Sequence, residues 1–170
     1  MHGHRVLRRV VAAMACSLCA AATVVYQGPL TGGAEVPPVS TPAIGYVSVS
    51  NAGANLLQVD VTFSGLSASA TAAHIHCCAA PGTNAGVAVP MPAFPTATSG
   101  HYIHDFLLDD ASTYSSAFIT ASGGTAAGAQ AALLNALLSD DAYFNIHNSV
   151  FPGGEVRAIL TQTIFRNGFD

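Results

Sequence analysis

The chain of 170 residues is long enough for one domain with a full hydrophobic core, and it carries nine Asp and Glu against five Lys and Arg. Three of the basic residues lie among the first nine, so the remainder has Arg157 and Arg166 against nine carboxylates, a net charge of about −7. Nucleic acid and anionic membrane surfaces are therefore not expected as partners, because both bind clustered Lys and Arg.

Residues 1–22 have the pattern of a secretory signal peptide, in which a basic start precedes an apolar stretch that ends in three alanines. We predict cleavage after Ala22 and a secreted or periplasmic protein. A lipoprotein signal ending at Cys16 and an uncleaved anchor are the alternatives. Both fit less well, because only about six apolar residues precede Cys16 and the whole apolar stretch is shorter than the roughly 20 residues that span a bilayer. No later segment is long enough, so we expect no transmembrane segment in the mature chain.

The first half of the mature chain predicts antiparallel strands. Residues 23–51 are extended, with an interruption by prolines, and residues 57–63 alternate apolar and polar side chains, which is typical of a strand with one buried face. A further strand carries the sequence Ala72–Cys78. The short apolar run 87–89 is followed by three prolines, which exclude a regular central strand there. Residues 100–108 predict the next strand.

Two helices and a hairpin are predicted in the second half. Asp110 is a candidate cap for a short helix that ends at Ala121, and Thr125 caps a second over Ala126–Leu138. An apolar stripe on the second helix predicts core packing, and it consists of Leu133, Leu134, Leu137 and Leu138. The last hairpin joins residues 143–147 to residues 155–163. The sequence thus predicts a mainly β fold with one or two short helices before this hairpin.

The pattern His74-Ile75-His76 indicates a metal site. In a strand the two histidines project from the same face, with their Cα atoms roughly 7 Å apart. His147 adds a third imidazole if its strand is a neighbour, and three neutral imidazoles leave a fourth position open on the ion. The affinity order favours Cu(II), then Zn(II). The alternative is a hydrogen-bonded cluster that joins two strands.

Cys77 and Cys78 have three interpretations. The Cα atoms of adjacent residues lie about 3.8 Å apart, below the usual disulfide range of about 4.4 to 6.8 Å, so a bridge between them is expected to be strained. We still favour the bridge, because two free thiols in an exported protein are prone to oxidation. The third interpretation is ligation of copper by these sulfurs, with His101 as a further candidate ligand. His101 and His104 are expected on opposite faces of their strand.

Five sequence blocks resemble the CHRD domain, a module of chordin and of many secreted bacterial proteins. The blocks are Gly33–Pro38, Phe63–Leu66, Ala73–His76, Tyr143–His147 and Pro152–Arg157. The resemblance covers residues 23–162 and implies an extracytoplasmic, antiparallel, Greek-key-like β-sandwich. The chain differs at Ala158, where the family usually has Gly. Residues 163–170 are a short C-terminal tail that resembles a signature of other secreted bacterial proteins.

A fainter similarity links the chain to the copper/zinc superoxide dismutases, which are also β-sandwiches. His74, His76 and His147 correspond in order and type to copper ligands of that family. The rest of the dismutase site does not correspond, because the spacing of His101, His104 and Asp105 does not match its bridging and zinc ligands.

Glu35, Glu155 and Arg157 are expected to form structural ion pairs or to cap turns, since Glu155 and Arg157 share a face of a predicted strand. No hydrolase, kinase or dinucleotide-binding motif occurs. We therefore expect a secreted, non-catalytic binding or structural module for an extracytoplasmic ligand or protein, with a candidate histidine metal site. The alternative function is a copper-binding redox protein or carrier.

Overall fold

The computed structural model describes residues 23–51, 53 and 55–163. The predicted signal peptide over residues 1–22 lies outside the described residues, as does most of the predicted tail. Within the described part, no helix is both long and apolar enough to cross a membrane.

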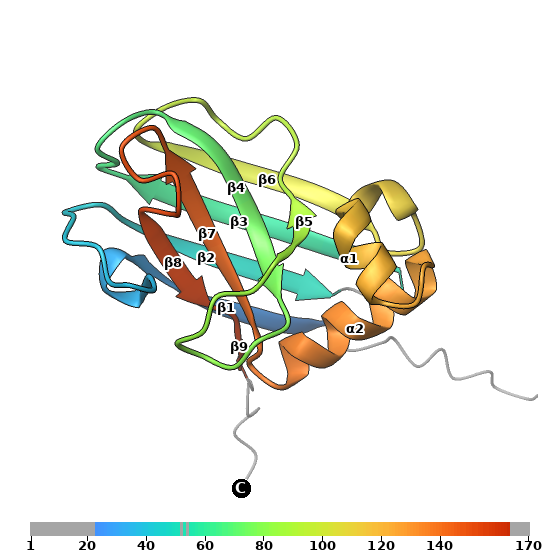
Figure 1. The fold of residues 1–170 in the computed structure, drawn as a ribbon. Helices are drawn as coiled ribbons and strands as arrows, with labels where there is room; N and C mark the ends of the chain where they lie inside the picture. Colours follow the sequence, from blue (N-terminus) through green and yellow to red (C-terminus); the bar gives the residue numbers. More distant parts are fainter. Residues whose placement is uncertain (1–22, 52, 54, 164–170) are drawn as a thin grey trace, which may run out of the picture.

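In the described part of the chain, nine strands form one curled antiparallel sheet with the order β5-β4-β7-β8-β1-β2-β3-β6, in which β9 pairs with β1. The strands are β1 Val24–Thr31, β2 Ile44–Asn51, β3 Leu56–Ser64, β4 Ala70–Cys77, β5 Val87–Pro90, β6 Gly100–Leu107, β7 Ala142–Asn148, β8 Val156–Ile159 and β9 Thr161–Thr163. Because the sheet curls, β4, β7 and β8 cross over β1, β2, β3 and β6 (Figure 1). This confirms the mainly antiparallel fold and is consistent with a β-sandwich.

The core lies between the two layers of the curled sheet. In β3, Leu57, Val59, Val61 and Phe63 are buried, as their alternation predicts. In β4 the inward residues Ala73, Ile75 and Cys77 are at most 5% exposed. Since side chains alternate along a strand, His74 and His76 must project from the outer face of the same layer.

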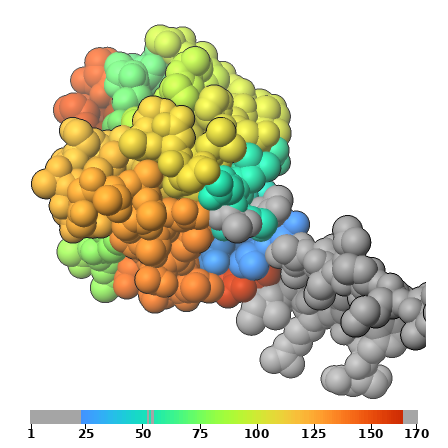
Figure 2. Space-filling model, turned by 90° about the vertical axis from the view of Figure 1, so that its right-hand side faces the viewer, coloured from blue at the N-terminus to red at the C-terminus, as the bar shows by residue number. Residues whose placement is uncertain are grey.

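Two α-helices, α1 Ser116–Ala121 and α2 Ala126–Leu138, cover one end of the sandwich (Figure 2). The Thr125 hydroxyl accepts from the backbone N–H of Gly128, so the predicted cap of α2 is confirmed. The prediction of one helix from Asp110 to Ala121 is wrong. Asp110 caps only a 3₁₀ turn over Ala111–Thr113, and α1 has its own cap at Ser115.

The predicted leucine stripe of α2 is only half correct. Leu133 and Leu137 are fully buried, and Leu134 is partly buried against the core. Leu138 is 60% exposed, because it follows Leu137 directly and therefore points about 100° away from it around the last turn.

The predicted continuous strand over residues 155–163 is divided in two. Strand β8 begins at Val156 and pairs with β7, and at Arg157 also with β1, whereas β9 pairs with β1 alone. Between them Leu160 is fully buried and donates its N–H to Ala142 O. The chain thus passes from one layer to the other at Leu160, which a pattern of alternating residues does not reveal.

Candidate metal centre on the outer face of the sheet

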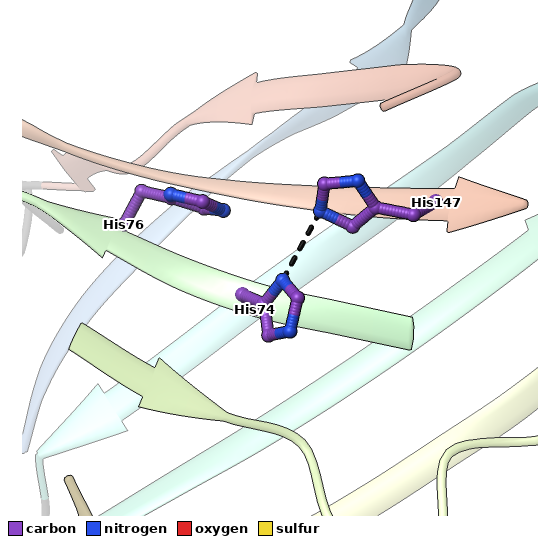
Figure 3. Close-up of side chains that lie close together, drawn as sticks. All are labelled: His74, His76 and His147. Carbon is purple, nitrogen blue, oxygen red and sulfur yellow. Dashed lines mark hydrogen bonds between the residues drawn. The ribbon is translucent and has the colours of Figure 1, made fainter. Parts of the chain in front are cut away.

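His74, His76 and His147 converge on the outer face of β4 and β7. In the antiparallel register His74 lies opposite Asn145 and His147 lies opposite Ala72, so His147 is diagonal to His74. One ring nitrogen from each histidine lies within 4.8 Å of the others, as for groups that could hold a metal ion. Figure 3 shows the His74 and His147 rings facing each other across the two strands.

Backbone carbonyls determine which nitrogens of these rings carry protons. His76 Nδ1 lies 2.9 Å from Ala85 O, and His147 Nδ1 lies 2.9 Å from Pro152 O. A carbonyl oxygen only accepts, so both Nδ1 atoms are donors and both Nε2 atoms are free of hydrogen in the neutral rings. His74 Nδ1, 3.1 Å from His147 Nε2, must then be the donor of that pair. His76 and His147 thus each have an unprotonated Nε2, and the carbonyls orient these two rings as second-shell groups do at metal sites. In the neutral His74 ring, the nitrogen that faces His147 carries the hydrogen and Nε2 is unprotonated.

The surroundings favour the neutral, ligand-competent form of all three rings. Burial lowers the pKa of His74 to about 4, with further lowering from the charges of His147 and His76. Burial is also the largest influence on His76 and His147, whose pKa values lie below the ordinary value of 6.5, and Arg157 lowers both further. A metal therefore competes with few protons at neutral pH.

An aromatic stack supports the site from the side of β8. The Tyr143 ring is parallel to that of His76, with centroids 4.7 Å apart, and the Arg157 guanidinium carbon lies 3.9 Å from the Tyr143 centroid. The Tyr143 hydroxyl accepts from Ala85 N–H, whose carbonyl orients His76. Tyr143 thus couples the loop after β4 to both the ring of His76 and the buried arginine.

Arg157 forms a buried ion pair with Glu35 rather than with its near neighbour Glu155. Its Nε and Nη2 atoms both lie 2.9 Å from Glu35 Oε2, and Nη2 also donates to Asn84 Oδ1. Burial raises the pKa of the Glu35 carboxyl, and Arg157 opposes this effect. Because Glu35 follows the 3₁₀ turn Gly32–Ala34 after β1, the pair ties that turn to β8.

Glu155 stabilises a different junction. Its carboxylate accepts from the Ser67 backbone and hydroxyl, from the Thr41 hydroxyl and from the Asn148 amide. Burial alone would raise the pKa of Glu155, but these hydrogen bonds together lower it. The group therefore holds two loops against the end of β7, a structural role of the kind expected from the sequence.

The other candidate ligands do not join the histidine group in the described part of the chain. Cys77 and Cys78 are bonded to each other through their sulfurs, and their peptide bond is cis, so the Cα atoms lie 3.1 Å apart rather than at the trans spacing. The Cys77 side chain points to the core face of β4. His101 lies on β6 and contacts Asp60 at 2.8 Å.

Sequence reasoning missed Asn145 as a site residue. It lies on β7 two residues before His147, so both side chains project from the same face, and it is only 1% exposed. The signal that could have identified it is an amide between the apolar residues Phe144 and Ile146, on the same face of the strand as His147, since buried polar groups need partners.

Comparison with known proteins supports the CHRD resemblance. Neither the curated proteins nor the solved structures include a match to this chain. The family model of the CHRD domain matches residues 26–160, which include all five blocks quoted from the sequence. The protein therefore belongs to the CHRD-domain family.

Proposed function

We propose that this protein is an exported, non-catalytic binding module whose outer sheet face binds one Cu(II) ion, and Zn(II) less tightly, through His74, His76 and His147. The observation that carries the proposal is the convergence of three ring nitrogens within 4.8 Å of one another. Imidazole suits both metals, and the affinity order peaks at copper. Two of the rings are already oriented by carbonyls, which reduces the ordering that binding requires.

A hydrogen-bonded cluster that joins β4 to β7 is the competing explanation, since His74 donates to His147 between these strands. That role explains the positions of His74 Nδ1 and His147 Nε2, one nitrogen of each ring. It does not account for His76 Nε2, which is buried and has no hydrogen-bond partner among the described residues. Metal binding would give this atom a partner.

Calorimetry on protein purified without a histidine tag tests the proposal. We expect one equivalent of Cu(II) to bind at pH 7, and Zn(II) to bind with lower affinity. The variant with alanine at all three histidines should lose this binding, whereas His101→Ala should retain it. Circular dichroism must show that the triple variant is folded. Absence of copper binding by the wild type, or unchanged binding by the triple variant, would contradict the metal site.

A copper carrier or redox protein is the second candidate. It is favoured by the partial exposure of His74 and His147, which leaves two of the three ligands accessible for exchange of the ion. Transfer of copper from the loaded protein to a chelator, together with a superoxide assay, distinguishes these roles. A carrier should release copper within the assay without consuming superoxide.

Export is the remaining part of the proposed function, and it rests on the sequence of residues 1–22. The mature N-terminus should be Thr23, because the three preceding alanines provide the small residues that signal peptidase requires. Mass spectrometry of the exported protein would detect this terminus. An intact Met1 or a lipid on Cys16 would contradict it.

A further inference from the structure

Asn145 is a neighbour of the histidine group in the strand register. On β7 it lies between Tyr143 and His147, and in the register with β4 it lies directly opposite His74 and diagonal to His76. Side chains that are opposite or diagonal in an antiparallel pair are within reach of each other. The amide is therefore within reach of the rings of His74 and His76, and it is almost completely buried.

The two ends of the Asn145 amide face different groups. A Cβ atom added to Gly154 would collide both with Asn145 Nδ2, at 2.7 Å, and with Glu35 Oε1. Because both atoms crowd the same point, the amide nitrogen lies beside the Glu35 carboxylate. The oxygen is on the other arm of the amide. This Oδ1 is buried and has no hydrogen-bond partner among the described residues, as is also true of His76 Nε2.

These two unpartnered atoms cannot satisfy each other in the neutral site. His76 Nδ1 donates to Ala85 O, so Nε2 has no hydrogen to give, and an amide oxygen only accepts. Only the protonated His76 ring could donate a hydrogen bond to Asn145. That bond would raise the pKa of His76, but burial lowers the pKa by more. A buried acceptor without a partner is destabilising, because it has lost its hydrogen bonds to water. A cation placed between them would serve both atoms.

Building on the metal site proposed above, we propose that Oδ1 of Asn145 is the fourth protein ligand of the ion, beside one nitrogen from each histidine. The ligand set is then three imidazoles and one neutral amide oxygen. Four protein ligands give the closed arrangement found in structural zinc sites, whereas catalytic zinc sites have three protein ligands and an open position. The proposal thus favours binding or carriage of copper over catalysis.

Copper titration of Asn145→Ala tests this ligand. We expect about a tenfold or greater loss of Cu(II) affinity and a shift of the copper visible absorption band, with recovery of affinity in Asn145→Asp, which keeps an oxygen at that position. Azide binds copper at positions that the protein does not fill. It should bind the copper-loaded alanine variant at least tenfold more tightly than copper-loaded wild type.

Asn148→Ala is the matched control, because Asn148 is on the same strand and equally buried, but its oxygen accepts from Val150 and Phe151 N–H. This variant should lose stability without a change in the copper spectrum or in azide affinity. If wild type binds no copper, the proposed function fails and the ligand assignment fails with it. If wild type binds copper, and Asn145→Ala has the same spectrum and azide affinity, the ligand assignment alone is wrong.

A crystal structure of the copper-loaded wild type keeps the assignment testable should the alanine variant not fold. We expect a distance of about 2.0 to 2.5 Å between the ion and Asn145 Oδ1, the range of oxygen ligands. A distance above about 3 Å would overturn the assignment.

Discussion

The two outer faces of the sandwich both carry histidines, but in different surroundings. On the face formed by β4, β7 and β8, His74, His76 and His147 converge beside the buried pair Glu35–Arg157. On the face formed by β2, β3 and β6, His101 contacts Asp60 with both side chains about half exposed, at 56% and 46%. Loops cover the first face, whereas the second is exposed to water. Removing one partner of a side-chain pair should therefore reduce the free energy of unfolding much more on the first face than on the second.

The largest difference between the faces should appear in stability. Arg157→Met leaves the Glu35 carboxylate buried without its cation, so we expect a loss of about 3 to 5 kcal/mol in the free energy of unfolding. Asp60→Asn removes the exposed pair and should cost about 0 to 1 kcal/mol. Urea unfolding of both variants measures this contrast. Equal losses would mean that burial does not distinguish the two contacts.

Copper affinity should separate the faces next. His74→Ala removes one of three imidazole ligands and should weaken Cu(II) binding by about tenfold or more. Loss of a residue that only orients a metal ligand already lowers metal affinity by about 10- to 100-fold. His101→Ala removes an imidazole of equal chemistry from the other face and should leave the affinity unchanged. Calorimetry at pH 7 compares the two variants with wild type. A similar loss in both would place copper elsewhere on the protein.

A smaller effect is expected in the pH dependence of stability, where His74 should make the protein less stable as the pH falls. The folded pKa of His74, about 4, is below the unfolded value of 6.5, so the unfolded chain binds more protons between these limits. The contribution of neutral His74 to metal-free stability should therefore be present above about pH 6.5 and decrease as the pH falls towards about 4.

Urea unfolding with a chelator, at several pH values, measures this decrease. The stability of His74→Ala should fall less than that of wild type across the same range. Parallel curves for wild type and His74→Ala would show that burial of His74 does not disfavour its charged form.

Much of the fold follows from local patterns. Alternation from Leu57 to Phe63 predicts β3, because one face of that strand packs in the core and the other does not. Thr125 predicts the start of α2, because its hydroxyl satisfies a free N–H of the first turn. The failures occurred where a local signal had several outcomes, as at Asp110, which can cap a 3₁₀ turn as well as an α-helix.

The sequence by itself determined that His74 and His76 share a face, because the period of a strand is two and needs no partner. It also determined the membership of the CHRD family, through five blocks in a fixed order. Only the tertiary structure decided that His147 reaches the pair, that Arg157 binds Glu35, and that Asn145 lies opposite His74. These contacts join residues up to 122 positions apart. Strand register and the loops that cover the face determine which of these residues meet, and the local spacing of residues in the sequence does not predict either.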